Sequence, residues 1–162
     1  MNGEYIRALS QEEFLSRAKP YLDAALLRPV DREKLAAIIQ PRLETLAQIS
    51  EKVAFLNEMP EYDISLYTHK KMKTNSENSL VALQELLPRL EALEDFSGES
   101  LKNLVTEYVA EKGIKNGQAL WPLRTAVSGR QMTPGGAYEI MEILGKEESL
   151  QRIRKGIELL CQ

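Results

Sequence analysis

The dominant feature of this sequence is a helical repeat of apolar residues that is bounded by helix caps and glycine stops. Its clearest part is a run of leucines at three- and four-residue spacing, namely Leu80, Leu83, Leu86, Leu87, Leu90 and Leu93. A second stripe runs from Leu101 to Val109 and meets Gly113. Such spacing places apolar side chains on one face of a helix with 3.6 residues per turn. We therefore predict two amphipathic helices over these stripes.

Capping residues and prolines divide the earlier part of the chain. Ser10 followed by Glu13 is a capping box, which predicts a first helix with a kink or break near Pro20. Asp31 is expected to cap a second helix, and Pro41 to interrupt the helical spacing that continues toward Leu56.

The remaining segments are less regular. Residues 57–79 mix Pro, Asn, Asp and charge, so we expect a loop that contains a short helix. The C-terminal part is predicted to form three short helices separated at Gly129 and Gly145. Only residues 63–67 and 123–127 could pass as strands, and neither alternates strongly.

These patterns predict an all-α fold. With 162 residues and 43% hydrophobic composition, the chain can bury a sizeable core. We expect two small helical bundles, with residues 1–95 in the first and 96–162 in the second, because the helical pattern breaks near 94–100.

Several classes of site lack the residues they need. The chain has a single histidine, His69, and a single cysteine, Cys161, so no metal cluster or internal disulfide is expected. We find no Walker-type loop and no dinucleotide-binding glycine fingerprint, and we predict no catalytic residues. Without a long apolar run or a secretory leader, the chain is expected to be cytoplasmic, without a membrane partner.

Charge is distributed unevenly along the chain. The net charge of −3 disfavours a phosphate-binding surface. Residues 112–155, however, carry eight Lys and Arg against four Asp and Glu, a local excess of +4. This excess indicates either a basic surface or a fluctuation among solvated helix faces. His69 lies beside lysines in a stretch that is either a solvated basic turn or an RNA-backbone contact.

Three blocks carry a family resemblance. They are the opening MNGEYIRALS, the stretch QPRLETL, and the closing block that contains WPLRTAVSGRQMTPGG and ends near LGKEESL. In order and spacing these blocks span nearly the whole chain, and they resemble the C-terminal half of bacterial glutamyl-tRNA synthetase.

The resemblance implies an all-helical anticodon-binding region in two subdomains. In that family it is appended to a Rossmann catalytic half, which ligates glutamate to tRNA with ATP and Mg²⁺. The expected partner is the anticodon arm of glutamate tRNA, with no DNA partner. We expect this chain to be a monomeric fragment that holds no cofactor of its own.

The resemblance also implies roles for individual residues. Arg42 corresponds to the residue that inspects the third anticodon base, and without the resemblance it would be a surface ion pair at a helix start. Arg124 and Thr133 correspond to residues around the other two bases. Thr133 is equally suited to cap a helix before Pro134. Possible phosphate contacts, each alternatively a solvated charge, are Lys112, Lys115, Arg130, Lys146 and Arg152.

Three aromatic residues could stack on a nucleobase or pack inside the protein. Tyr5 and Tyr21 lie near apolar positions at helical spacing, so we predict that they are core or half-core residues rather than stacking platforms. Trp121 either packs in the core or stacks on a base.

The competing function is a helical scaffold that binds protein partners through an exposed apolar groove and does not bind RNA.

Overall fold

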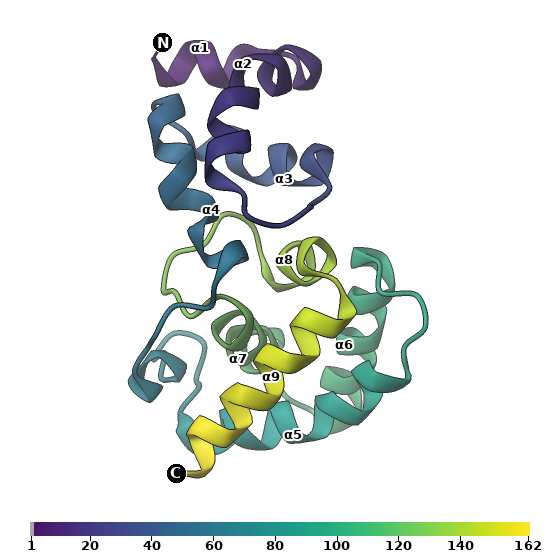
Figure 1. Cartoon of the computed structure of the whole chain (residues 1–162). Coiled ribbons are helices and arrows are strands. Elements are labelled where there is room, and N and C mark those ends of the chain that lie inside the picture. The colour runs from purple at the N-terminus through teal and green to yellow at the C-terminus, as the bar shows by residue number, and fades with distance from the viewer. Residues whose placement is uncertain (1) are drawn as a thin grey trace. The chain divides into compact units, whose positions relative to one another are not determined.

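A computed structural model describes residues 2–162 and confirms the all-helical prediction. Within this range there is no β-strand, and the only bridge joins His69 to Thr74. The helices fall into two compact units (Figure 1). Unit 1 contains the chain up to Met59 together with Met132–Gly135, and unit 2 contains Pro60–Gln131 and Gly136–Gln162.

Unit 1 is built from short helices. They are α1 (Gly3–Ala8), α2 (Gln11–Ala25), α3 (Arg32–Ile39), the 3-10 turns η1 (Gln40–Arg42) and η2 (Leu46–Gln48), and α4 (Ile49–Asn57). Helix α2 packs on both α3 and α4. Large buried side chains of this unit are Ile6, Phe14, Leu22, Leu35, Ile39, Leu43, Ile49, Phe55 and Leu56.

Both predicted caps of unit 1 are confirmed. The Ser10 hydroxyl accepts a bond from the Glu13 amide at 3.2 Å and donates to the Glu13 carboxylate at 3.0 Å. The Asp31 carboxylate accepts bonds from the amides of Glu33 and Lys34. Pro20 lies inside α2 without ending it, whereas the break predicted at Pro41 coincides with η1.

Helix α1 is fastened to the 3-10 turn that carries Arg42. The side-chain amide of Gln40 donates to the carbonyls of Ile6 and Leu9, at 2.9 and 2.8 Å. Arg7 donates to the carbonyl of Leu43 at 3.1 Å. The two Gln40 bonds add a side-chain donor to carbonyls at the C-terminal end of α1, where a helix leaves carbonyl groups without its regular backbone partners.

Unit 2 contains the remaining helices of the described chain. They are the 3-10 turn η3 (Ile64–Tyr67), α5 (Ser76–Ala92), α6 (Gly98–Lys112), α7 (Asn116–Ser128), α8 (Ala137–Leu144) and α9 (Lys146–Cys161). The predicted stops at Gly113, Gly129 and Gly145 are confirmed, because all three glycines have positive φ. The two segments considered as strands lie in η3 and α7.

The observed division of the chain differs from the predicted boundary at residues 95 and 96. Helix α5 packs along α7 and α9, as Figure 1 shows, so it belongs to the same unit as the C-terminal helices. The interrupted pattern near 94–100 marks the α5–α6 connection inside unit 2. A break in helical periodicity therefore identified a loop between helices of one unit, while the units divide between Met59 and Pro60.

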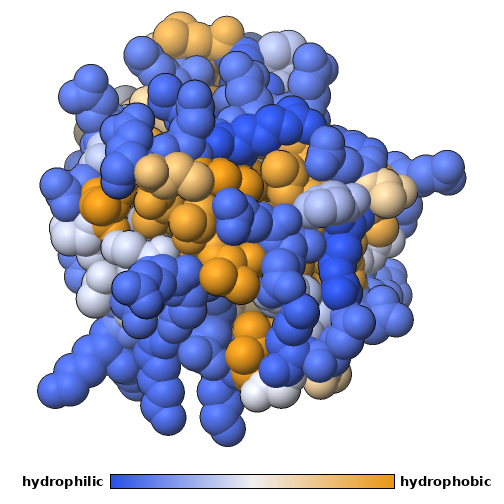
Figure 2. Space-filling model, turned by 90° about the horizontal axis from the view of Figure 1, so that it is seen from below, coloured by the Kyte–Doolittle hydropathy of each residue, from blue (hydrophilic) through white to orange (hydrophobic). Residues whose placement is uncertain are grey.

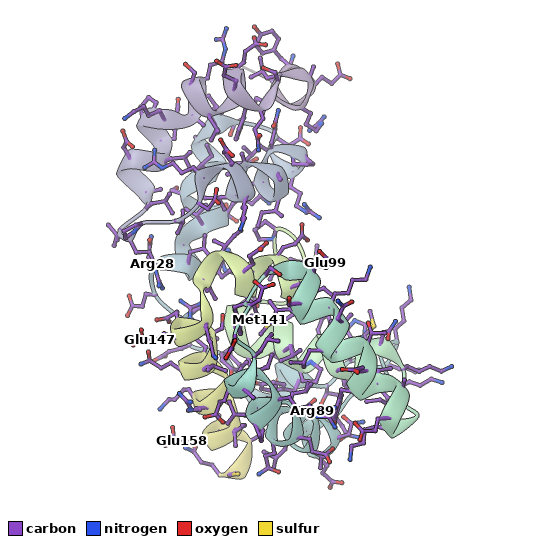
Figure 3. All side chains as sticks on the ribbon, turned by 90° about the vertical axis from the view of Figure 1, so that its right-hand side faces the viewer. Arg28, Arg89, Glu99, Met141, Glu147 and Glu158 are labelled. Carbon is purple, nitrogen blue, oxygen red and sulfur yellow. The ribbon has the colours of Figure 1, made fainter. Side chains whose placement is uncertain are left out.

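In the core of unit 2, helix α9 lies close to Tyr67 of η3. Met141 of α8 is buried among the helices, whereas Glu147 and Glu158 project from α9 into solvent (Figure 3). Gly156 of α9 is also buried, and a Cβ atom there would lie 2.6 Å from the Tyr67 hydroxyl. The absence of a side chain at Gly156 thus allows α9 to approach Tyr67, which itself is fully buried.

Residues 2–162 contain no helix with the length and apolar character needed to cross a membrane. On the face shown in Figure 2, apolar side chains gather near the middle of the view, and hydrophilic side chains surround them.

Candidate functional site

Arg42 lies at the end of η1 with an exposed side chain. One terminal nitrogen of its guanidinium donates to the carbonyl of Ile38 at 2.7 Å, which satisfies a group at the end of α3. No ion pair of Arg42 with a carboxylate occurs among residues 2–162. The alternative of a surface ion pair at a helix start therefore does not describe Arg42, and most of its five N–H donors remain available.

Arg124 lies one helical turn after Trp121 on α7. Its guanidinium carbon is 4.6 Å from the centre of the Trp121 ring, within the range of a cation–π contact. The residue is half-buried, and its Nε atom is buried without a hydrogen-bond partner. Burial lowers the pKa of Arg124 from its ordinary value, although arginine remains charged near neutral pH. The side chain thus presents an unsatisfied cationic donor.

The chain that follows α7 folds back to Arg124. Gly129 adopts a left-handed conformation, and the Ser128 hydroxyl donates to the Arg124 carbonyl at 2.6 Å. The Arg124 guanidinium donates to the carbonyl of Gln131. The helix stop predicted at Gly129 therefore lies in a turn that brings the chain back to Arg124.

A cavity of about 270 Å³ opens beside this arginine. Most of its lining is apolar, and among the described residues Arg124 is the only charged one that lines it. The residues that line it are Met72, Gly117, Leu120, Trp121, Arg124, Gly136 and Ala137. An apolar cavity with one planar cation suits a flat, polar-edged ring such as a nucleobase.

The indole of Trp121 packs inside unit 2, which decides the question that the sequence left open. The residue is 8% exposed, and its Nε1 donates to the Leu66 carbonyl at 2.9 Å. The ring of His69 lies 4.2 Å from it, centre to centre. The interpretation of His69 as part of a solvated turn was therefore wrong for its side chain. The imidazole is partly buried against Trp121.

Thr133 lies in the segment Met132–Gly135, which groups with unit 1. Its hydroxyl donates to the Gly135 carbonyl at 2.9 Å. The N-cap of α8 is Gly136, so Thr133 does not cap that helix. The contact keeps the hydroxyl within its own loop, where the oxygen can still accept a second bond.

Of the two predicted positions for Tyr5 and Tyr21, core or half-core, the structure excludes the core position, because both side chains are about half-exposed. Tyr5 is 49% exposed and Tyr21 42% exposed. The Arg17 guanidinium lies 5.6 Å from the Tyr5 ring centre. Both tyrosines lie on helical faces directed at solvent, a distinction that apolar neighbours in sequence do not reveal.

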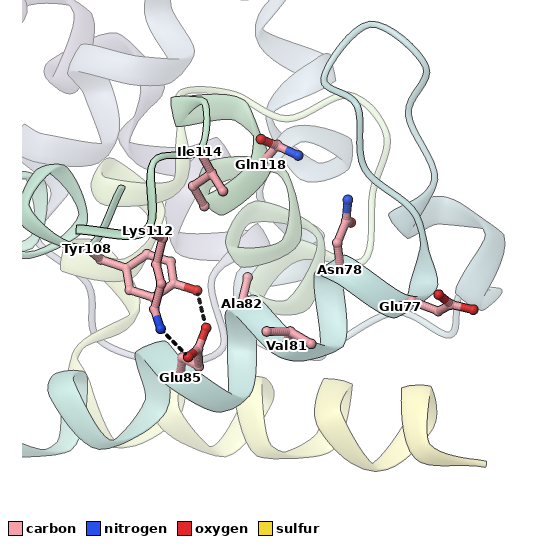
Figure 4. Close-up of a pocket in the computed structure, with 9 residues that line it drawn as sticks. All are labelled: Glu77, Asn78, Val81, Ala82, Glu85, Tyr108, Lys112, Ile114 and Gln118. Atoms are coloured by element: carbon pink, nitrogen blue, oxygen red, sulfur yellow. Dashed lines mark hydrogen bonds and ion pairs between the residues drawn. The ribbon is translucent and has the colours of Figure 1, made fainter. Parts of the chain in front are cut away.

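Lys112 is held by a carboxylate rather than left free for an anion. Its Nζ lies 2.6 Å from Glu85, which also accepts a bond from the Tyr108 hydroxyl at 2.9 Å (Figure 4). These residues line a cavity of about 410 Å³ between α5, α6 and α7. The Lys112 bond lowers the pKa of Glu85, so the pair is charged on both sides. Lys112 is consequently a weak candidate for a phosphate contact.

Two other predicted phosphate contacts are engaged in structural bonds. Arg152 has a side chain only 3% exposed, paired with Glu148 at 2.8 Å and bonded to the Val127 carbonyl at 2.7 Å. Its burial contradicts the predicted role. The Lys146 ammonium donates to the carbonyls of Glu91 and Leu93, both at 2.7 Å, and thereby caps the end of α5.

The remaining two predicted phosphate contacts differ in exposure. Lys115 is exposed immediately before α7, and no ion pair of its side chain is found within the described chain. Arg130 is half-buried in the returning loop. Of the five, Lys115 presents the most accessible cation.

Residues 13–157 match the family model described as "Anticodon binding domain". The chain belongs to this family. The match covers most of the sequence and includes Arg42, Arg124 and Thr133.

Curated relatives of this chain are glutamate–tRNA ligases. That of Lachnoclostridium phytofermentans is 54% identical over 160 residues, and that of Clostridium botulinum is 52% identical over 160 residues. Each alignment covers 99% of this chain and 33% of the relative, so the chain spans about a third of their length. The resemblance found in the sequence is confirmed.

Solved structures agree with this assignment. A glutamate tRNA ligase from Elizabethkingia meningosepticum, in complex with its amino acid, superimposes with a TM-score of 0.84 at 28% identity. The superposition covers 98% of this chain and 31% of the other. The fold of the anticodon binding domain is thus shared over nearly the full chain.

Sequence reasoning missed most of the cavity beside Arg124. Met72 and Gly117 lie far apart in sequence and meet only in the folded unit, so no local pattern indicated them. The Trp121–Arg124 contact did have a signal, because residues three apart on a helix are neighbours on its surface. No group of His, Cys, Asp and Glu suited to a metal ion occurs in the described part of the chain.

Proposed function

We propose that this chain reads the anticodon of glutamate tRNA as one part of a glutamate–tRNA ligase. The supporting observation is the half-buried Arg124, stacked on Trp121 beside an apolar cavity, with a buried Nε that lacks a partner. A half-buried guanidinium at the wall of an apolar cavity favours a ligand that brings hydrogen-bond acceptors into that cavity. The family assignment and the ligase relatives support the same ligand class.

Recognition of an anticodon suits this chemistry. Specific RNA recognition mostly uses unstacked loop bases, which insert into aromatic or guanidinium surfaces and bond along their edges. Arg124 offers both a plane and donors at its cavity, and Thr133 offers a hydroxyl from the following loop. We assign these two residues to the first two anticodon bases.

Arg42 is assigned to the third anticodon base. Its guanidinium is exposed, and its bond to the Ile38 carbonyl fixes one nitrogen while leaving other donors free. The preference for cytosine, which would distinguish glutamate tRNA from glutamine tRNA, is what the family resemblance implies for this position, and a planar donor fork can give the base two hydrogen bonds.

The catalytic step belongs to the remainder of the ligase. We propose that this remainder binds ATP and Mg²⁺ and joins glutamate to tRNA, while this chain contributes only binding and discrimination. The proposed setting is the cytoplasm, where charged tRNA is used, and the proposed state of the chain is a monomer.

Titration with tRNA tests the proposal directly. Trp121 is the single tryptophan of this chain, so its fluorescence reports from beside Arg124. Glutamate tRNA should change this fluorescence and bind more tightly than an unrelated tRNA at each of two salt concentrations. Equal affinity for both tRNAs would contradict the proposal.

Arginine variants test which residues cause the preference for glutamate tRNA. Arg42→Gln and Arg124→Gln should each weaken binding of glutamate tRNA by about 1–3 kcal/mol, the usual value of one base contact. The matched control is Arg154→Gln, which removes an exposed arginine of α9 that pairs with Glu91. In the full-length ligase, Arg42→Gln should also reduce the preference for glutamate tRNA over glutamine tRNA.

A further inference from the structure

Residues 69–74 form a turn that concentrates unneutralised positive charge, and we name it the basic turn. It carries Lys70, Lys71 and Lys73, all exposed. Among residues 2–162 no ion pair of these three lysines is found, in contrast to the paired Lys112. From residue 69 to residue 78 the only carboxylate is Glu77. The turn therefore has a local excess of positive charge within an acidic protein.

The backbone of the basic turn is held rigidly. His69 and Thr74 exchange two backbone hydrogen bonds, both 3.1 Å long. The Thr74 hydroxyl donates to the Tyr67 carbonyl at 2.7 Å, and the amide of Met72 donates to Nδ1 of His69 at 3.1 Å. A fixed backbone reduces the ordering cost when charged side chains bind a ligand.

Lys73 has an unusual conformation for a lysine. Its φ is +60°, and among the described residues it is the only residue other than glycine with positive φ. Its carbonyl accepts bonds from the side chains of Asn78 at 3.0 Å and Gln118 at 3.3 Å. Glycine would adopt this conformation without strain, so the presence of lysine indicates a use for its side chain.

The basic turn adjoins the cavity of Arg124. His69 contacts the Trp121 ring, and Met72 lines the cavity together with Trp121 and Arg124. A Cβ atom on Gly117 would lie 2.7 Å from Sδ of Met72, which shows how closely the turn packs on α7. The lysines therefore flank the place where we assign a nucleobase.

We propose that the basic turn binds the sugar–phosphate backbone of the RNA next to the base held at Arg124. This inference rests on the proposed function and adds a second contact surface to it. Phosphate contacts position a nucleic acid while base contacts specify it. An RNA ligand satisfies both features, because it brings a flat base for the cavity and adjacent phosphates for the lysines.

Salt dependence separates this role from base recognition. The variants are Lys70→Gln with Lys71→Gln, and the matched control is Lys102→Gln with Lys155→Gln, which removes two exposed lysines elsewhere in unit 2. Glutamate tRNA is titrated at several salt concentrations. Each lost phosphate contact on a single strand should reduce the slope of log affinity against log salt by about 0.7. The control variant should retain the slope of the unmodified chain.

Lys73→Gly distinguishes loss of charge from loss of fold. Loss of charge lowers tRNA affinity without lowering the unfolding temperature, whereas loss of fold lowers both. Glycine relieves the positive φ, so the thermal unfolding temperature should stay equal or rise, while tRNA affinity and the salt slope fall. A salt slope unchanged in both turn variants would overturn the proposal.

The outcome also separates the two proposals. If the turn variants keep the slope while Arg124→Gln still loses preference for glutamate tRNA, only the phosphate role fails. If the unmodified chain shows no preference for glutamate tRNA over an unrelated tRNA, the proposed function fails, and the role of the basic turn fails with it.

Discussion

The guanidinium carbon of Arg124 lies 4.6 Å from the centre of the Trp121 ring, and the two residues are one turn apart on α7. The ring is itself fixed, because its Nε1 donates to the Leu66 carbonyl at 2.9 Å and His69 contacts it. The position of the arginine thus depends on a tryptophan that is almost fully buried.

Substitution of Trp121 should affect tRNA binding through Arg124. Trp121→Leu removes the ring, and a cation–π contact is typically worth about 0.5–2 kcal/mol, so affinity for glutamate tRNA should fall roughly 2- to 30-fold. Trp121→Phe retains a ring and should restore most of the affinity. Because the Leu66 carbonyl loses its donor, Trp121→Phe should still reduce the free energy of unfolding by about 1–2 kcal/mol. Denaturation followed by circular dichroism measures the stability of both variants, and a tRNA titration measures their affinity. An equal loss of affinity in the two variants would contradict the idea that the Trp121 ring positions Arg124.

Gly156→Ala should destabilise the chain, although alanine normally favours a helix. Its Cβ would lie 2.6 Å from the Tyr67 hydroxyl, which is buried and bonded to Tyr62 at 2.7 Å. Overpacking of this kind costs about 1–3 kcal/mol. Gly98→Ala is the control, because the nearest atom there, on Glu142, lies at an ordinary 3.4 Å. Urea unfolding midpoints should fall for the first variant only.

Arg152→Gln should destabilise the chain without changing the salt dependence of tRNA binding. It leaves the Val127 carbonyl and Glu148 without the donors that now bond them, and loss of one partner of a buried pair costs about 2–4 kcal/mol. Arg154→Gln removes an exposed ion pair and should cost less than about 1 kcal/mol. A reduced salt slope in Arg152→Gln would restore the phosphate role that burial contradicts.

Stability should decline in alkaline solution partly because of Tyr108. Burial, with a contribution from Glu85, raises the pKa of Tyr108 to about 12, compared with an ordinary value of 10. The folded chain holds this proton more tightly than the unfolded chain, so the contribution is complete below pH 10 and is lost as pH rises toward 12. Unfolding midpoints measured in urea between pH 8 and pH 12 should show this decline. Tyr108→Phe should show a shallower decline over the same range, and an equal decline would exclude Tyr108 as a cause.

Local signals in the sequence were sufficient for most helix ends. Ser10 and Asp31 act as caps, and Gly113, Gly129 and Gly145 end helices, because each acts on backbone groups within a few residues. The boundary between units was not available from such signals. It depends on α5 packing against α7 and α9, which is a relation between distant segments.

The candidate site shows the same limit. The family resemblance identified Arg42, Arg124 and Thr133, whose roles in binding stay predictions. Sequence alone could not distinguish Arg152 and Lys146 from surface cations. Their partners are carbonyls and carboxylates that include Val127 and Glu91, contributed by other helices.

The two bonds from Gln40 to Ile6 and Leu9 have a practical consequence for shortened versions of this chain. Removal of the first nine residues would leave the side-chain amide of Gln40 without these two acceptors. The 3-10 turn that carries Arg42 would lose the hydrogen bonds that now hold it against α1. Truncations intended to isolate Arg42 and its proposed base contact must therefore retain the N-terminal helix, even though none of the residues assigned to that contact lies in this helix.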